Sequence, residues 1–334
     1  MKRNIFESIK KVITPQKKIE QMQQEISCRE AYSYWSILAD RYILIDTLNL
    51  VKNFSHDIEY VNIIKTHIKL IKAENQQMES LLEKFSITAP PPNTEDMNLT
   101  GNTEAMRDRV SSHLLYSFYR AEISVLAQTL KDALLNDDAR QFMRNLFEKD
   151  LQRLDKYIKY LKIKEWIVFP PHYQYLPNNV NEKVAINEIH YLWDHLVSRH
   201  NNIRLTQIAV SYTNDIDFKA IVETGLNILL KQADDLQKKL LNYGVQLPES
   251  FTNVTITPQS PEVIEDRFLY TSILEGMKNA TSLHALASSE IITNDNLRKF
   301  FANLTYSELD YVNNLIRYGK LKGWITIPPK YKMG

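Results

Sequence analysis

A single register relates the two halves of this chain, because positions 158 residues apart match without a gap. The segment 166–173 reads Trp-Ile-Val-Phe-Pro-Pro-His-Tyr and returns at 324–331 as Trp-Ile-Thr-Ile-Pro-Pro-Lys-Tyr. The same shift places Glu30, Trp35, Leu38 and Arg41 on Glu188, Trp193, Leu196 and Arg199, Asp57 on Asp215, and Asp108-Arg109 on Asp266-Arg267. Chance similarity does not hold one register through a whole domain, so the pattern indicates a duplicated domain.

The repeat also predicts where the domains lie. We expect an N-terminal extension at 1–27, a first domain at 28–177, a linker at 178–185 and a second domain at 186–334. The joint at 176–181 contains one proline and three asparagines, which is typical of a linker. The extension is rich in lysine. It is expected as a poorly ordered tail or, alternatively, as a basic amphipathic helix that contacts a membrane or a partner.

Each copy is predicted to contain four helices. In the first copy they cover about 28–53, 57–85 and 104–135, and the fourth follows 136–138. Ser27 and Glu30 have the spacing of a capping box, and apolar residues recur at helical intervals in each segment. Glycine is scarce, with seven in the chain, which suits an all-α fold.

Loop lengths suggest the topology. The first and second helices are joined by a few residues, as are the third and fourth, so each pair should form an antiparallel hairpin. The second and third are joined by long polar stretches, at about 88–103 and 246–261. Such a stretch reaches roughly 50 Å when extended, and a helix of about 25 residues is roughly 38 Å long. We therefore predict two tandem ferritin-like four-helix bundles, each made of two hairpins and one crossover.

Several short motifs occur along the chain in an order that resembles a known family. The first helix carries Trp and Arg, Asp-Ile opens the second helix, Asp-Arg-Phe occurs at 266–268, and Lys-Gly-Trp occurs at 322–324 before Pro-Pro at 328–329. This order resembles an uncharacterised family of duplicated ferritin-like proteins from endospore-forming bacteria, itself similar to the spore coat protein F group. The resemblance implies a sporulation setting with coat components or self-association as partners, and it implies no reaction.

A ferritin-like bundle raises the question of a metal site. A di-iron site needs two Glu-x-x-His motifs, and the chain contains none. Glu74 and Glu122 fall on Gln232 and Ala280, so these carboxylates do not recur. The weaker alternative is a divergent iron, manganese or zinc site in the second copy alone. Its candidate ligands are His190, Asp194, Glu223 and Glu275, and we predict no cofactor.

The recurrent tryptophans and charges are interpreted as structural. Trp35 and Trp193 are expected in the core stripe of the first helix, and Trp166 and Trp324 to fold each tail over the end of its bundle. For the recurrent charges we expect an ion pair that ties the first helix to the third. These charges are Arg41 with Asp108 and Arg109, and Arg199 with Asp266 and Arg267. An anion-binding pair is the alternative.

Composition limits the remaining functions. The formal charge is +1, so no basic field recruits nucleic acid. The single cysteine excludes an internal disulfide and fits a reducing compartment. No signal peptide core, membrane span, phosphate loop or nucleophile motif is visible. We expect a cytoplasmic or spore-coat protein that is structural or interacting rather than an enzyme. The alternatives are the divergent metal protein and a small-molecule binder that uses the bundle interior.

Overall fold

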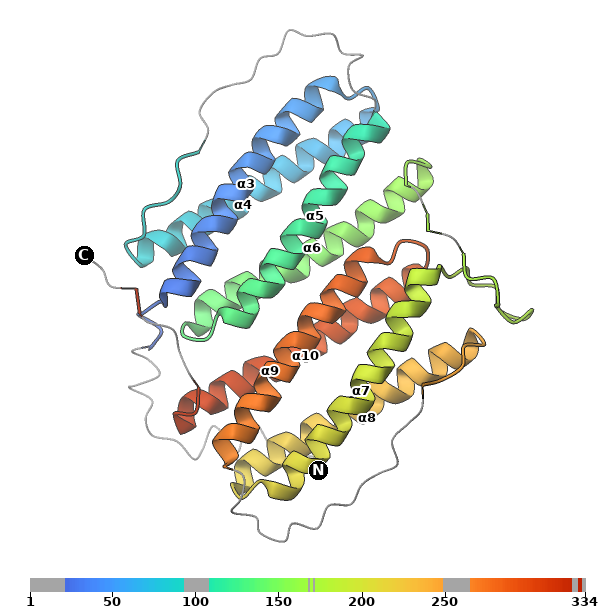
Figure 1. Cartoon of the computed structure of the whole chain (residues 1–334). Helices are drawn as coiled ribbons and strands as arrows, with labels where there is room; N and C mark the ends of the chain where they lie inside the picture. The colour runs from blue at the N-terminus through green and yellow to red at the C-terminus, as the bar shows by residue number, and fades with distance from the viewer. Residues whose placement is uncertain are drawn as a thin grey trace, which may run out of the picture. The chain divides into compact units, whose positions relative to one another are not determined.

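The computed structural model describes residues 22–92, 108–167, 169–170, 172–248, 265–325 and 330–331. Within these ranges the chain is all-helical, with eight long helices and no strand (Figure 1). They are α3 (Cys28–Phe54), α4 (Ile58–Lys84), α5 (Asp108–Asp132), α6 (Asp137–Ile163), α7 (Ile186–Tyr212), α8 (Ile216–Asn242), α9 (Asp266–Glu290) and α10 (Asp295–Lys322). None of these helices is apolar over a length sufficient to cross a membrane. Residues 1–21 of the extension predicted at 1–27, and most of both crossovers, lie outside the described residues.

The chain divides into two compact units. The first unit contains α3–α6 and the second contains α7–α10. In the first unit α3 packs beside α4, α5 beside α6, and α3 against α5. The second unit repeats this arrangement with α7 beside α8, α9 beside α10, and α7 against α9. Turns of a few residues join the members of each pair, which makes each pair an antiparallel hairpin.

The boundary between the units differs from the one expected at 177. Residues from Phe169 onward belong to the second unit, and the C-terminal residues 330–331 belong to the first. Tyr331 donates its backbone N–H to the Ile26 carbonyl at 2.8 Å, and Tyr173 donates to the Val184 carbonyl at 2.8 Å. Each tail therefore extends the segment that precedes the first helix of the other repeat. The predicted linker is likewise part of a core, because Val184 is fully buried.

The helix starts are local features, and they lie where capping chemistry predicts them. Ser27 and Glu30 form the capping box that their spacing suggests. The side chain of Asp57 caps α4 by accepting from the N–H of Tyr60, and that of Asn136 caps α6 by accepting from the N–H of Ala139. Side-chain oxygens at these positions satisfy amides that the first helical turn leaves unpaired.

Glu30 also makes contacts that a capping box does not require. It is 1% exposed, and its Oε1 accepts from the backbone N–H groups of Leu135 and Asn136 at 3.0 and 3.1 Å. Glu188 repeats this contact with the N–H groups of Thr293 and Asn294 at 2.7 and 3.0 Å. One recurrent carboxylate therefore joins the start of the first helix to the turn between the third and fourth helices.

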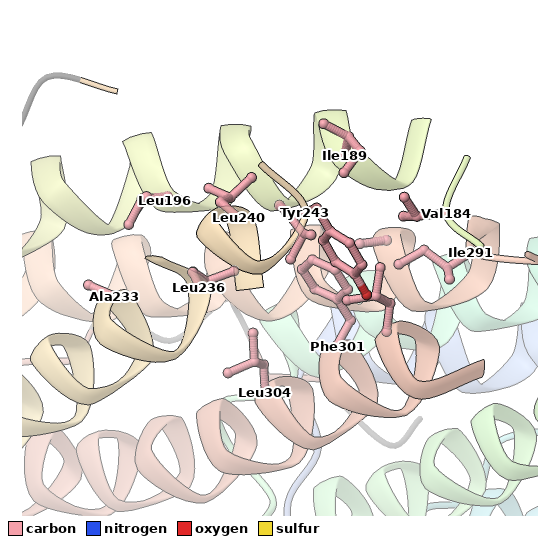
Figure 2. Close-up of a cluster of buried hydrophobic side chains, with 13 residues drawn as sticks. Val184, Ile189, Leu196, Ala233, Leu236, Leu240, Tyr243, Ile291, Phe301 and Leu304 are labelled. Atoms are coloured by element: carbon pink, nitrogen blue, oxygen red, sulfur yellow. The ribbon is translucent and has the colours of Figure 1, made fainter. Parts of the chain in front are cut away.

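The apolar stripes meet inside each unit. In the second unit the cluster draws on all four helices and on the segment before α7 (Figure 2). Its fully buried members include Val184, Leu196, Leu236, Ile291 and Phe301. Removing such side chains from water is the main force that holds helices of this kind together.

Core partners exchange places between the repeats. In the first unit Tyr157 of α6 donates its hydroxyl to the carbonyl of Ser112 on α5, at 2.8 Å. In the second unit the equivalent positions hold Leu315 and Tyr270, and Tyr270 of α9 donates to the Leu315 carbonyl of α10 at 3.1 Å. In each unit one tyrosine lies between the third and fourth helices, but it comes from the fourth helix in the first unit and from the third helix in the second. Such an exchange is tolerated because it preserves the packed volume.

Two glycines of the second unit provide a stability test. Gly225 of α8 lies against Tyr311, so an added Cβ would overlap the tyrosine ring, whereas a Cβ on Gly276 of α9 meets open space. We expect Gly225→Ala to lower the free energy of unfolding by about 1–3 kcal/mol through overpacking. The control Gly276→Ala should raise it by up to about 1 kcal/mol, since alanine favours a helix. Urea unfolding measures both, and a shift in the same direction for both variants would contradict the packing argument.

Candidate functional site

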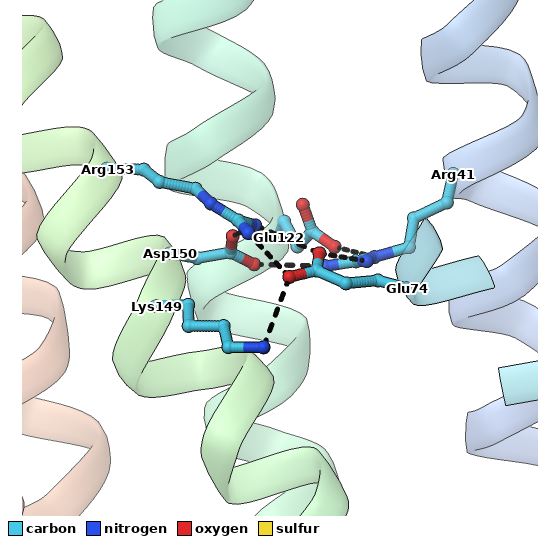
Figure 3. Close-up of polar contacts among 6 residues, drawn as sticks. All are labelled: Arg41, Glu74, Glu122, Lys149, Asp150 and Arg153. Atoms are coloured by element: carbon cyan, nitrogen blue, oxygen red, sulfur yellow. Dashed lines mark hydrogen bonds and ion pairs between the residues drawn. The ribbon is translucent and has the colours of Figure 1, made fainter. Parts of the chain in front are cut away.

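The first unit has a charged centre built around Arg41 (Figure 3). Arg41 lies on α3 and is 1% exposed. Its Nε donates to Glu122 of α5, its Nη1 donates to Glu74 of α4 at 3.0 Å, and its Nη2 donates to Asp150 of α6 at 3.2 Å. One guanidinium therefore joins all four helices through three separate carboxylates.

A second arginine completes this centre. Arg153 of α6 donates to Asp150 at 2.7 Å and to Glu74 at 3.0 Å, and Lys149 lies 3.6 Å from Glu74. Burying a charge is costly unless it is paired and hydrogen-bonded. The donors of Arg41 used here are matched to carboxylate oxygens, so the centre is closed by its own side chains.

The surroundings decide which groups of the centre are charged. Burial alone would raise the pKa of Glu74, but hydrogen bonds and charges from Arg153 and Arg41 outweigh it and lower that pKa. Burial and the neighbouring Glu122 raise the pKa of Asp150, against the opposing effect of the two arginines. The carboxylates together hold the pKa of Arg41 above its ordinary value despite its burial. The centre is thus an arginine held between carboxylates of unequal acidity.

The second unit keeps the arginine but loses two of its three carboxylates. Arg199 of α7 is 1% exposed, and its Nη2 donates to Glu308 of α10 at 2.8 Å. Gln232 and Ala280 occupy the positions that correspond to Glu74 and Glu122. The Nε and Nη1 atoms of Arg199 are buried and have no hydrogen-bond partner.

Two histidines replace apolar residues beside Arg199. His195 and His284 stand where the first unit has Ile37 and Leu126, and their rings stack with centroids 5.0 Å apart. Burial lowers the pKa of His195 to about 3, and burial and Arg199 lower the pKa of His284. Both rings are therefore neutral at physiological pH.

The recurrent aspartates do not pair with these arginines. Asp108 accepts from the backbone N–H of Asp57 at 2.7 Å, and Asp266 accepts from that of Asp215 at 2.8 Å. Each aspartate thus holds the turn between the first two helices against the start of the third, while Arg109 and Arg267 are exposed. In the first unit an ion pair between the first and third helices exists, but its acidic partner is Glu122 rather than Asp108. In the second unit the expected pair is not found, because Arg199 pairs with Glu308 of the fourth helix.

The four proposed metal ligands are not brought together. His190, Glu223 and Glu275 are exposed, and Glu275 pairs with Lys278 at 2.8 Å. Asp194 is half-buried on α7. Across the described ranges, no three histidine, cysteine, aspartate or glutamate side chains are placed to hold a metal ion. The i, i+4 spacing puts His190 and Asp194 on one side of α7, but among the described residues no carboxylate of another helix joins them to form a metal site.

The two tryptophan pairs have different outcomes. Trp35 and Trp193 are 38% and 41% exposed, so their assignment to the core was wrong. Helical periodicity identifies a stripe only approximately, and here the buried stripe contains Leu38 with Tyr34 in place of Trp35. Trp166 packs edge-on against Tyr60 at 5.8 Å and Trp324 against Phe218 at 5.5 Å. These two cover an aromatic cluster at the end of each unit.

Each comparison with known proteins covers less than half of the chain. A family model described as a protein of unknown function, DUF3231, matches residues 175–333. A solved structure from Bacillus halodurans C-125, described as a "putative spore coat protein", is 20% identical, with a TM-score of 0.40. The match covers 43% of this chain and 93% of that one. No curated protein matches this chain.

Proposed function

We propose that this is a non-enzymatic structural or interaction protein that acts in sporulation. The observation that carries the structural part is the closed charged centre of the first unit. There the four helices converge on Arg41, and its donors are taken up by Glu74, Glu122 and Asp150. A guanidinium at this place links the helices and leaves no open coordination position of the kind that catalytic metal sites need.

We further propose that each unit is a ferritin-like bundle in which the crossovers connect the two hairpins. The support is the pairing of α3 with α4 and of α5 with α6, repeated in the second unit. In ferritin-like oxidases, inward-facing carboxylates of the four helices hold metal. In this chain the inward-facing carboxylates of the first unit hold arginine instead, which fits a scaffold better than an oxidase.

The sporulation setting rests on the order of sequence motifs, and it implies coat components or further copies of the chain as partners. The test is to follow a fluorescently tagged protein through sporulation in a spore-forming host. We expect the signal to accumulate at the developing spore and to stay with the purified spore. A uniform signal in growing cells, with none in the spore, would overturn the setting.

The metal-binding alternative has a separate test. Protein purified without chelators should be analysed for iron, manganese and zinc by mass spectrometry. We expect less than one tenth of an equivalent of each. A stoichiometric metal that survives gel filtration would replace the structural proposal with the metal-binding one.

A further inference from the structure

The two units contain cavities at equivalent places. One lies between α3 and α5 and has a volume of about 160 Å³, and the other lies between α7 and α9 and has a volume of about 190 Å³. Eight of the nine residues that line the first have their counterparts, 158 positions later, among the residues that line the second. The cavities are therefore one inherited feature that has diverged, and Arg41 or Arg199 lies at each.

The second unit lacks two of the three hydrogen-bond acceptors that surround the arginine in the first unit. In the first unit the Nε of Arg41 donates to Glu122 and its Nη1 to Glu74. In the second unit the equivalent atoms of Arg199 are the two that have no partner. Only the third donor, Nη2, keeps its carboxylate, which is now Glu308. A buried arginine whose donors are unmatched is unfavourable, so an acceptor from outside the chain would stabilise it.

The same substitutions make room for such an acceptor. Ala280 replaces Glu122, and Gly276 replaces the bulky Phe118. A Cβ built on Gly276 would meet nothing within 4 Å. Solvent reaches this place, because Asn279 and Leu283 line the cavity and are both exposed.

The lost carboxylates favour a small anionic ligand. The centre of the first unit combines Arg41, Arg153 and Lys149 with three carboxylates. The centre of the second combines Arg199 with Glu308 and two histidines that burial keeps neutral. Arg199 therefore has one carboxylate where Arg41 has three, and a small monoanion would supply one of the two that are missing.

We propose that the second unit binds a small monocarboxylate in the cavity between α7 and α9. Its carboxylate accepts from Nε of Arg199, in the place that the side chain of Glu122 occupies around Arg41. Charge-assisted pairing of a guanidinium with a carboxylate supplies the recognition. This site is independent of the structural role proposed above, and localisation of the protein in the cell does not test it.

Acetate is the simplest probe, and the full chain is the material. Thermal unfolding at constant pH and ionic strength should be followed in sodium acetate and in matched sodium chloride. A ligand that binds only the folded state raises Tm with its concentration. We expect Tm to rise with acetate beyond the chloride control, and titration calorimetry to give one acetate per chain.

Two variants test the location of the site. Ala280→Glu restores the carboxylate of the first unit, so it should raise Tm without ligand and weaken acetate binding at least tenfold. Gly276→Phe fills the cavity without adding charge and should also remove the acetate response. It serves as a second test should the restored carboxylate disturb folding. Glu223→Gln, an exposed change outside the cavity, should leave the response unchanged.

Three outcomes would overturn the proposal. The first is a wild-type Tm that responds to acetate no more than to chloride. The second is a response that survives both Ala280→Glu and Gly276→Phe. The third is an equal response to inorganic phosphate, which would replace the carboxylate assignment with a general anion site.

Discussion

Replacing Arg41 with methionine (Arg41→Met) is expected to lower the free energy of unfolding of the first unit by about 3–5 kcal/mol, the range found when one partner of a buried ion pair is removed. Methionine has a similar length and can fill the space, so the loss is mainly electrostatic. Without Arg41, Glu122 loses a partner, Asp150 keeps Arg153, and Glu74 keeps Arg153 and the Lys149 ammonium at 3.6 Å. Urea unfolding at pH 8 measures the effect.

The pH dependence identifies the cause of this loss. In the variant the effect of burial on Asp150, which already raises its pKa, is opposed by Arg153 alone, so this pKa lies further above that of the unfolded chain. The folded state then binds more protons than the unfolded state, so stability rises as the pH falls through this raised value. The cost of Arg41→Met should therefore be smaller at pH 5 than at pH 8. A cost that does not change between pH 5 and 8 would indicate lost packing instead.

Arg199→Met is the matched control in the second unit. Arg199 pairs with a single carboxylate, Glu308, and burial already raises the pKa of that carboxyl group. Glu308 can therefore take up a proton when its partner is removed, and the loss should be smaller than for Arg41→Met. Equal losses in both units would contradict the importance of the three-carboxylate network.

Glu30→Gln is expected to cost about 3 kcal/mol or more, although the two side chains have nearly the same shape. Glu30 accepts from Leu135 and Asn136 through one oxygen, and from the N–H and Oγ of Ser27 through the other at 2.9 and 2.7 Å. In a glutamine one of the two side-chain oxygens is replaced by an NH2 group, which is a donor and would face the N–H or O–H donors that Glu30 accepts from. At least two hydrogen bonds to a charged group are then lost, each worth about 1.5–3 kcal/mol.

The duplicated chain supplies a repeat of this experiment and a control. Glu188→Gln should produce a similar loss in the second unit, because Glu188 accepts from the backbone of Ala185, Thr293 and Asn294. The exposed Glu223→Gln should change stability by less than about 0.5 kcal/mol. Both are read by thermal and urea unfolding. Losses below 1 kcal/mol at both Glu30 and Glu188 would show that water replaces the carboxylate.

Sequence patterns predicted the parts of the fold that depend on neighbouring residues. The all-helical class, the capping box at Ser27 and the helix starts at Asp57 and Asn136 are confirmed. The capping box and the two helix starts each depend on hydrogen bonds within three residues of the cap. Periodicity was less accurate about which side of a helix faces inward, as exposed Trp35 shows, since one residue changes the facing direction by about 100° in a helix with 3.6 residues per turn.

The candidate site was visible in the sequence only as separate parts. Arg41 and Arg199 were noted as recurrent, and Glu74 and Glu122 as carboxylates that the second copy lacks. Nothing in their spacing says that they meet at one guanidinium, because Glu74, Glu122 and Asp150 lie 33, 81 and 109 positions from Arg41. The covarying replacement of Glu74 and Glu122 between the copies was the signal that could have revealed the network.

By itself, the sequence determined that the domain is duplicated, that it is helical and where most helices start. The constant register, the apolar periodicity and the capping residues can all be seen in the order of residues along the chain. Only the tertiary structure decided what the recurrent residues contact: Arg41 between three carboxylates, Arg199 beside a cavity, and each tail against the start of the other repeat. The physical reason is that burial and charge pairing depend on side chains from separate helices, whose meeting is set by packing and not by distance along the chain.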